Sequence, residues 1–438
     1  MKINNHYKFV SLLLILLSIL SFFIGFIYGE NSAGAGTLQG DFDGLWKNLQ
    51  TFLNNDIFTA LKFTAEFDPE NYYKSSRPPL IYILHKLFNP FIENKIIFIK
   101  SVFVISLLAP VLFYLCLKQK FKSESNLLLI LISSTILLSP YFRTSAYWGL
   151  EENYGLICLL ISFLFFNQFL SNRNHSWKDY YLLFFTTFFS SLCIYFDQKL
   201  IIIPLICFFH ILFSGKNLKL KILLFVFYFI FSLPYIYLAI SWESIIPSID
   251  AQGRGIGKRL YFEHIGYAVT IIAFYLFPLL LYKNANFFDT FKNFFSERKN
   301  YYFISLFFIY LLYLLIFYNY DNEVNLGKGF IHKTALLLFK EIYIQEIFIY
   351  FSFFVSWIIV LIYVNNNLND KLIIFYFILL SIIISPILQE YFDPLIILMA
   401  FTFFGSRLII NFKYSILFFL YFSVLLILSN VYYYNLLS

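Results

Sequence analysis

The stretch FVSLLLILLSILSFFIGFIY, which runs from Phe9 to Tyr28, contains no charged side chain. About twenty predominantly apolar residues are enough for one helix to cross the hydrocarbon core of a bilayer. The small residues from Ser32 to Gly36 resemble a signal-peptide cleavage region, but the stretch is longer than the roughly 7–15-residue core of a signal peptide. We therefore expect an uncleaved signal anchor, and with it an integral membrane protein.

Similar apolar stretches recur along the whole chain and predict about thirteen transmembrane helices. They lie at about 9–28, 96–117, 126–140, 153–170, 180–196, 200–214, 222–240, 265–282, 301–319, 343–363, 372–388, 394–410 and 414–434. Of the 438 residues, 60% are hydrophobic and 13% are charged, whereas a soluble domain has about 45–50% apolar and about 25% charged residues. The predicted fold is an all-α, polytopic transmembrane helical bundle that forms one integral membrane domain over residues 1–438.

The distribution of charge predicts how this bundle is inserted. Short basic loops, such as KQKFK from Lys118 to Lys122, alternate with loops that hold most of the carboxylates. The positive-inside rule then places the N-terminus in the cytoplasm and the C-terminus outside the cytoplasmic (inner) membrane. We interpret the net charge of +7 as a sign of insertion among membrane lipids rather than of nucleic-acid binding. Any active site is expected to face outside, where no free nucleotide is supplied.

The longest outer loop, residues 30–95, is predicted to hold two interfacial helices. The first follows the segment GDFDG, and its apolar residues recur at the spacing of one helix face. These residues are Trp46, Leu49, Leu53, Ile57 and Ala60. The second helix covers residues 80–92, after Pro78 and Pro79. It is too short and too polar to span, so we expect both helices to lie in the plane of the membrane surface.

Three motifs resemble those of the GT-C class of membrane glycosyltransferases, which includes protein O-mannosyltransferases and the aminoarabinose transferases of lipid A. They are the acidic pair Asp41 and Asp43 after the first span, the basic residue before Pro-Pro-Leu in Arg77–Leu80, and the segment SPYFRTSAYWGLEEN from Ser139 to Asn153. The order of a short N-terminus, one helix, a long outer loop and a bundle is also similar to that class. The sequence departs from it in one respect, because Asp-Phe-Asp replaces the usual adjacent Asp-Glu.

The resemblance implies transfer of a sugar, with inversion, from a polyprenyl-phosphate donor to a hydroxyl of a lipid, glycan or protein acceptor. Asp41 or Asp43 would be the base that takes the acceptor's proton, and cations would stabilise the leaving phosphate. The candidates for phosphate binding are Arg143, Lys199, Arg254, Lys258, Arg259, Lys328 and His332. The candidates for substrate binding are Arg77, Trp148, Glu151, Glu152, Glu390 and Asp393. A divalent metal cofactor is left open, and no metal ligands are assigned.

Several of these residues also have structural interpretations. Asp43 is suited to cap a helix, Glu151 and Glu152 suit a helix N-terminus, and Asp393 before Pro394 suits a turn. Two other functions stay open as well. One is a polysaccharide polymerase or ligase of the O-antigen type, whose major outer loop generally falls late in the chain. The other is a transporter or flippase for lipid or solute, which places ionisable groups near the middle of the membrane.

Overall fold

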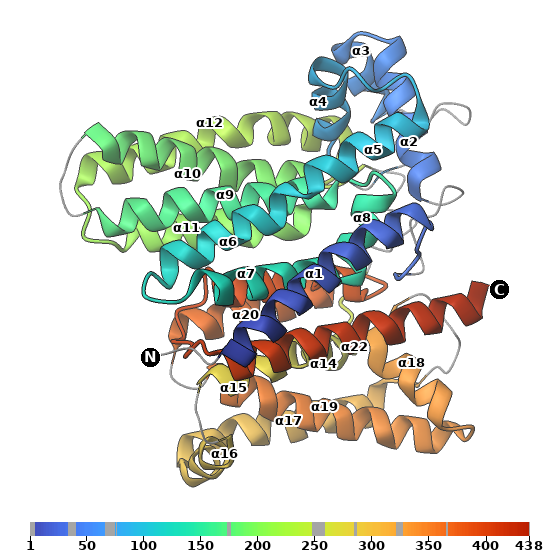
Figure 1. The fold of residues 1–438 in the computed structure, drawn as a ribbon, viewed down its shortest axis with the longest axis vertical. Coiled ribbons are helices and arrows are strands. Elements are labelled where there is room, and N and C mark those ends of the chain that lie inside the picture. Colours follow the sequence, from blue (N-terminus) through green and yellow to red (C-terminus); the bar gives the residue numbers. More distant parts are fainter. Residues whose placement is uncertain are drawn as a thin grey trace. The chain divides into compact units, whose positions relative to one another are not determined.

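The protein is helical throughout the part of the chain that the structure describes. The computed structural model describes residues 5–33, 41–65, 75, 77–172, 177–247, 259–283, 287–320, 327–364 and 367–437. Every secondary structure element in these ranges is an α-helix or a 3-10 helix (Figure 1). The predicted all-α fold is therefore confirmed.

Nine helices of the described chain are long and apolar enough to cross a membrane. They are Asn5–Ile27, Lys95–Lys120, Glu152–Ser171, Trp177–Phe196, Leu218–Trp242, His264–Lys283, Asn300–Phe317, Ile342–Val364 and Phe412–Tyr433. Each of them coincides with one of the predicted spans. The chain is thus a multi-pass membrane protein, as predicted.

The other four predicted spans are bent or short in the structure. The helices Asn126–Leu138 and Pro140–Tyr147 are bent by 68° and count as a tenth span only if the pair crosses the membrane together. The stretch predicted at 200–214 is the short helix Gln198–Leu212, and that at 394–410 is helical only over Leu395–Phe401. The fourth, at 372–388, ends at Ile383. The count of thirteen spans is therefore not confirmed, since a buried apolar turn is as hydrophobic as a spanning helix.

The helices form two compact units, and the single membrane domain stays a prediction. Unit 1 comprises Met1–Gly253 and Phe422–Ser438, and unit 2 comprises Arg254–Tyr421. The boundary near the C-terminus falls inside the last helix, α22 (Phe412–Leu437).

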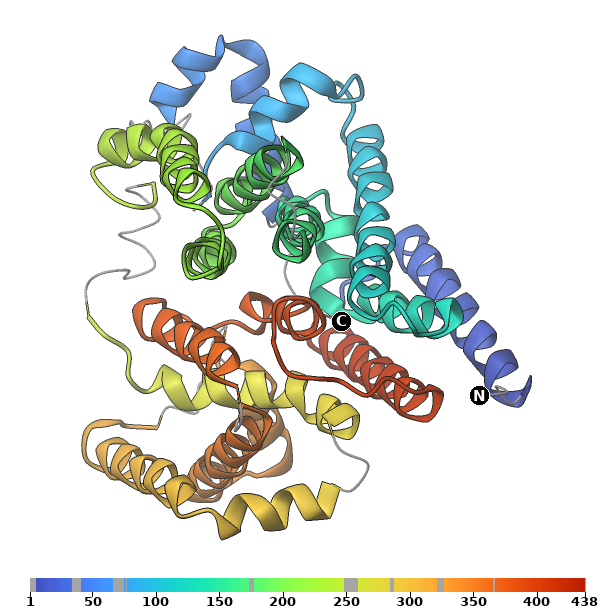
Figure 2. The ribbon, with the colours of Figure 1, turned by 90° about the vertical axis from the view of Figure 1, so that its left-hand side faces the viewer.

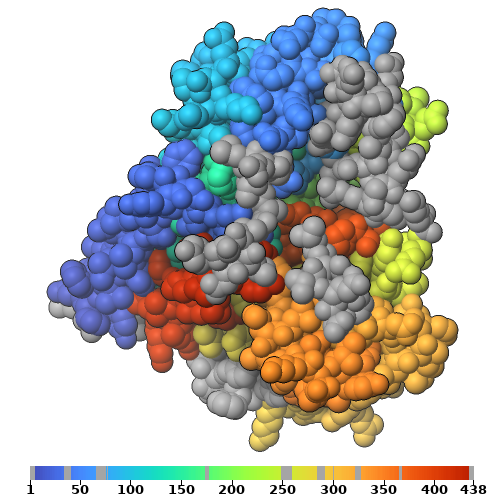
Figure 3. Space-filling view, turned by 90° about the vertical axis from the view of Figure 1, so that its right-hand side faces the viewer, coloured from blue at the N-terminus to red at the C-terminus, as the bar shows by residue number. Residues whose placement is uncertain are grey.

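Unit 1 is built around the long helices that follow the first loop. Helix α9 packs against α6 and α10, α10 packs against α11 and α12, and α1 packs against α7. Figure 2 shows α9–α12, in green, nearly end-on as a bundle, and Figure 3 shows α1, in dark blue, at the surface. The elements of unit 1 are α1 (Asn5–Ile27), α2 (Asp41–Asn54), α3 (Ile57–Phe63), α4 (Leu80–Phe88), α5 (Lys95–Ser106), α6 (Leu108–Lys120), α7 (Asn126–Ser134), η1 (Thr135–Leu138), α8 (Pro140–Tyr147), α9 (Glu152–Ser171), α10 (Trp177–Phe196), η2 (Gln198–Ile201), α11 (Ile202–Leu212) and α12 (Leu218–Trp242).

Unit 2 is built around one buried helix, α14, which packs against α18, α19, α20 and α21. Its elements are α14 (His264–Leu276), η3 (Phe277–Leu279), α15 (Leu280–Lys283), α16 (Phe287–Ser296), α17 (Arg298–Phe317), α18 (Gly329–Leu338), α19 (Ile342–Val364), α20 (Leu368–Ile383), η4 (Gln389–Tyr391), α21 (Leu395–Phe401) and the first part of α22.

The loop between α1 and α5 holds three short helices instead of the two predicted. The helix expected through residue 60 is split after Asn54, because the Asp56 carboxylate accepts hydrogen bonds from the N–H groups of Phe58 and Thr59 and caps α3. Helices α2 and α4 pack together through a stacked pair of rings, Phe52 and Tyr82, whose centroids are 5.5 Å apart. Whether these helices lie at the membrane surface stays a prediction.

Candidate active site

A short turn joins α8 to α9, and this turn positions two carboxylates. Helix α8 begins after Ser139, whose hydroxyl oxygen accepts a hydrogen bond from the Phe142 N–H at 3.0 Å. It ends at Tyr147, and Gly149 just beyond it has a φ of +71°, a backbone conformation that glycine adopts without strain. A Cβ atom on Gly149 would lie only 3.1 Å from the Phe98 ring. The turn therefore brings Glu151 and Glu152 to the start of α9 at a closely packed position.

Arg77 binds both of these carboxylates from the end of the first loop. Its Nη1 lies 3.2 Å from Glu151 Oε1, and its Nη2 lies 2.6 Å from Glu152 Oε1. The Ser145 hydroxyl donates a further hydrogen bond to Glu152 Oε2 at 3.0 Å. We call Arg77, Ser145, Glu151 and Glu152 the Arg77 cluster. It joins the first loop, α8 and the start of α9, which the sequence motifs had named only as separate segments.

The Arg77 cluster is buried and carries one more carboxylate than it has cations. The side chain of Glu151 is 5% exposed, against 17% for Glu152 and 21% for Arg77. Burial raises the pKa of Glu151; the charge of Arg77 opposes this rise and that of Glu152 adds to it. Tyr82 of α4 faces the same charges, and burial raises its pKa too. Excess negative charge in a buried place is typical of sites that bind a proton or a polar ligand.

The predicted catalytic pair, Asp41 and Asp43, lies in the first turn of α2. Asp43 is therefore inside the helix rather than its cap, where the helix dipole favours a carboxylate. It is 46% exposed and lies 3.5 Å from the ammonium of Lys95. The residue between the two acids, Phe42, is fully buried and packs beside Gly149, since its ring lies 3.6 Å from the Cβ position of that glycine. The start of α2 thus packs against the turn that carries the two glutamates.

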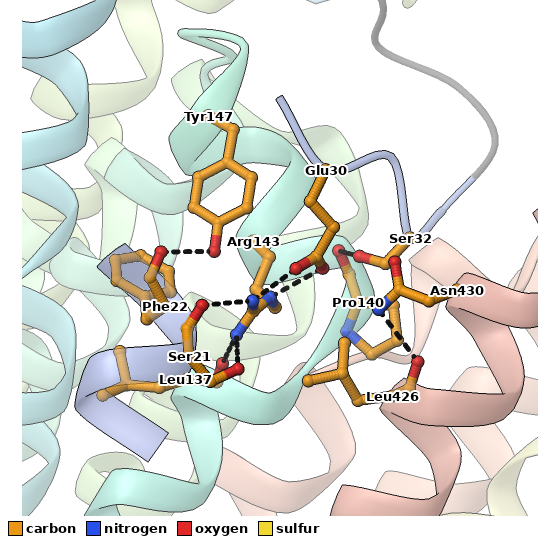
Figure 4. A network of polar contacts seen from close by, with 10 residues as sticks. All are labelled: Ser21, Phe22, Glu30, Ser32, Leu137, Pro140, Arg143, Tyr147, Leu426 and Asn430. Atoms are coloured by element: carbon orange, nitrogen blue, oxygen red, sulfur yellow. Dashed lines mark hydrogen bonds and ion pairs between the residues drawn. The ribbon is translucent and has the colours of Figure 1, made fainter. Parts of the chain in front are cut away.

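Arg143 is held in a different network, shown in Figure 4. It is 1% exposed, and its Nε and Nη2 donate to the two carboxylate oxygens of Glu30. The remaining N–H groups donate to the Ser21 hydroxyl and to the carbonyl oxygens of Ser21 and Leu137. A guanidinium has five N–H donors, and this network uses all five. Arg143 therefore has no N–H group left to donate to a phosphate in this arrangement.

Glu30 is the member of this network that sequence analysis did not single out. Helix α1 ends in a Schellman turn, in which Gly29 has a φ of +63° and the Glu30 N–H donates to the Gly25 carbonyl at 2.9 Å. This turn folds the Glu30 side chain back against Arg143. The sequence marks Glu30 only as an acid directly after the glycine that ends the first span. Its partner, Arg143, lies 113 residues away.

Two further candidates of unit 1 are Lys199, which is paired with a nearby carboxylate, and Trp148, which is not hydrogen-bonded through its indole nitrogen within the described chain. The Lys199 ammonium lies 2.9 Å from a carboxylate oxygen of Asp197, and the other oxygen of Asp197 accepts from the Lys199 backbone N–H. Trp148 directly follows α8, and its indole Nε1 is buried without a hydrogen-bond partner among the described residues. The same holds for Thr144 Oγ1 and Asn153 Oδ1. Three such atoms within one ten-residue segment beside the Arg77 cluster mark it as a place suited to a polar ligand.

Four of the candidates in unit 2 lie at or near two turns that a backbone hydrogen bond joins. Lys328, with a φ of +59°, precedes α18, and its backbone N–H donates to the Ile387 carbonyl at 2.7 Å. His332 is buried in α18, with its Nδ1 3.5 Å from the Tyr320 hydroxyl. Glu390 lies in η4, close along the chain to Ile387, and Asp393 follows it and is buried.

The remaining phosphate candidates lie elsewhere. Arg259 is exposed and pairs with Glu263 at 3.0 Å. Arg254 and Lys258 lie outside the described residues.

No group of three or more His, Cys, Asp or Glu side chains in the described ranges is arranged to hold a metal ion. Comparisons of the chain with models of protein families, with curated proteins and with solved structures find no match. The function is therefore argued from the Arg77 cluster and its surroundings.

Proposed function

We propose that this protein is a membrane glycosyltransferase that moves a sugar from a polyprenyl-phosphate donor to a hydroxyl of a lipid, glycan or protein acceptor. The transfer would take place on the outer face of the cytoplasmic membrane. The observation that carries the proposal is the Arg77 cluster, in which two segments that resemble GT-C motifs meet through short ion pairs.

The chemistry of the cluster suits this reaction better than a purely structural role. Buried charges are costly in an apolar membrane protein, and those that are kept there commonly have a function. Carboxylates accept hydrogen bonds from hydroxyl groups and can take a proton from an attacking oxygen. The cluster and the start of α2 together offer four carboxylates, those of Asp41, Asp43, Glu151 and Glu152, beside a turn with unpartnered polar atoms.

The leaving phosphate would need cations where its negative charge develops. Among the described residues of unit 1, Lys199 stays a candidate for this role. Arg77 serves the carboxylates instead, so it is expected to bind on the sugar or acceptor side.

The test is transfer by the purified protein from a panel of polyprenyl-phosphate sugars, repeated with Arg77→Gln. We expect transfer from at least one donor. We expect Arg77→Gln to lower kcat/KM by about 10²–10³-fold, the usual effect of removing one preorganised charged contact. Lys47→Gln is the matched control, because Lys47 is an exposed cation of the same loop. Absence of transfer from every donor by well-folded protein would exclude the proposal.

A further inference from the structure

The two glutamates of the Arg77 cluster differ in how many hydrogen bonds their carboxylates already accept. Glu152 uses both oxygens, one for Arg77 and one for the Ser145 hydroxyl. Glu151 interacts with Arg77 through Oε1 at 3.2 Å, and no other described side chain is hydrogen-bonded to it. A carboxylate has room for about four hydrogen bonds. Glu151 therefore has more room than Glu152 to accept a hydrogen bond from a substrate hydroxyl.

Glu151 also has the surroundings that a general base requires. Its side chain is 5% exposed, and a buried carboxylate beside a second carboxylate binds a proton at a higher pH than a solvated one. A base is most effective when its pKa is close to the working pH. The charged and titratable groups around it are Arg77, Glu152 and, on α4, Tyr82; the start of α2 adds Asp41 and Asp43 nearby.

The two aspartates lack these surroundings. Asp43 is 46% exposed and has the Lys95 ammonium as a counter-charge at 3.5 Å, and Asp41 is exposed. The acidic pair named by the resemblance is therefore less enclosed by the protein than Glu151, which lies in the turn between α8 and α9.

We propose that Glu151, rather than Asp41 or Asp43, takes the acceptor's proton, with Arg77 and Glu152 as its positioning residues; this rests on the proposed glycosyl transfer. In the step, the acceptor O–H bond breaks and its proton moves to the Glu151 carboxylate. The acceptor oxygen forms a bond to the anomeric carbon of the sugar. The bond from that carbon to the phosphate oxygen breaks, and its electron pair leaves with the polyprenyl phosphate.

The first test compares Glu151→Gln with the Asp41→Asn, Asp43→Asn double variant. We expect Glu151→Gln to lower kcat by about 10²–10⁴-fold, the usual contribution of a general base, with little change in KM. Glu93→Gln, an exposed acid of the same loop, should keep wild-type kcat. Loss of transfer in the aspartate double variant together with wild-type kcat in Glu151→Gln would overturn the inference and leave the proposed function standing.

The second test uses the pH dependence of kcat/KM, which a purely structural role would not move. The activity of the wild type should fall on the acid side at a pH above the usual range of a glutamate, because burial raises the pKa of Glu151. Glu152→Gln removes a negative charge that raises this pKa, so the acid limb should move to lower pH. Arg77→Gln removes a positive charge that lowers the pKa of Glu151. The residual activity of this variant should therefore fall off at a higher pH than that of the wild type.

Infrared titration separates this inference from the proposed function. The carbonyl stretch of a protonated carboxylic acid should persist above the usual pH range in the wild type and vanish in Glu151→Gln. Where transfer is measured but this band and the acid limb are unchanged by all three substitutions, Glu151 is not the base. Where no donor is used by the wild type, the proposed function itself fails.

Discussion

Gly25 is the residue on which the buried ion pair of Glu30 and Arg143 depends. A Cβ atom built on Gly25 would lie 2.4 Å from Glu30 Oε2, 2.5 Å from Arg143 Nη2 and 2.7 Å from the Tyr147 hydroxyl oxygen. All three distances are below van der Waals contact, so a side chain at this position would have to displace these three side-chain ends from their hydrogen bonds. The pair in turn ties the end of α1 to α8, and the Tyr147 hydroxyl adds a hydrogen bond to the Phe22 carbonyl at 2.7 Å.

We predict that Gly25→Ala destabilises the protein. Overpacking typically costs about 1–3 kcal/mol, and displacing one partner of a buried ion pair about 3–5 kcal/mol. The measurement is the midpoint of thermal unfolding in detergent. Gly215→Ala is the matched control, because nothing lies within 4 Å of the Cβ position there. Equal midpoints for the two variants would show that the Glu30–Arg143 pair does not need Gly25.

At the scale of elements, His85 joins α4 to two neighbouring helices. Its Nδ1 lies 2.9 Å from the Asn89 amide nitrogen, which can only donate, so Nδ1 is the acceptor and Nε2 carries the proton. That Nε2 lies 3.2 Å from the Tyr154 hydroxyl of α9, and the ring packs edge-on against Phe98 of α5 at 4.7 Å. The fit requires a neutral imidazole, and burial lowers the pKa of His85 to about 4.

This lowered pKa predicts a loss of stability in acid. The unfolded chain binds a proton at His85 below the ordinary pKa of 6.5, while the folded chain resists it down to about 4. The stabilisation is complete above pH 6.5 and is lost as the pH falls toward 4, by roughly 1.4 kcal/mol per pH unit at most. Unfolding midpoints measured between pH 7 and 5 should therefore fall less in His85→Gln than in the wild type. His6→Gln, at an exposed histidine, should keep the wild-type slope, and equal slopes for His85→Gln and the wild type would refute the assignment.

Elements were predictable from the sequence where their cause is local, and not where it is distant. The long spans follow from hydropathy alone, and all nine coincide with predicted stretches. The stretch at 394–410 was expected to be one helix, but the helix ends at Phe401. Beyond it, the carboxylate of Asp370 accepts from the Gly405 N–H at 2.7 Å and from the Ser406 hydroxyl. These hydrogen bonds cross more than thirty residues and leave no periodic signal.

In the candidate site, too, local motifs were predictable from the sequence and distant contacts were not. Arg77, Glu151 and Glu152 could be named because each lies in a recognisable local motif, but their pairing spans about 75 residues and needed the fold. Arg143 is a phosphate candidate in the sequence because it lies in a predicted outer turn, and its partner Glu30, 113 residues away, gives no local sign of the ion pair. A cation in a loop and a cation with all donors occupied look alike in a sequence, and only burial and distances distinguish them.

At the scale of the whole molecule, the proposed function depends on which side of the membrane the first loop faces. The helices α5 and α6 together form one candidate span, Lys95–Lys120. Residues just before and just after it must then lie on opposite sides of the bilayer. Glu93 and Lys122 are both exposed and flank this span, and the four native cysteines are buried, so introduced cysteines can be labelled over a low background.

We predict that Glu93→Cys reacts with a membrane-impermeant maleimide in intact cells, and that Lys122→Cys reacts only after the membrane is permeabilised. The reason is the positive-inside rule, since Lys122 ends the basic loop KQKFK. The reverse pattern would place the first loop in the cytosol. The reaction could then no longer be assigned to the outer face, where lipid-linked donors replace nucleotide sugars, and a cytosolic activity would have to be sought instead. Labelling of both positions from the same side would show that Lys95–Lys120 does not cross the membrane, and the inserted fold would need to be redrawn from that helix onward.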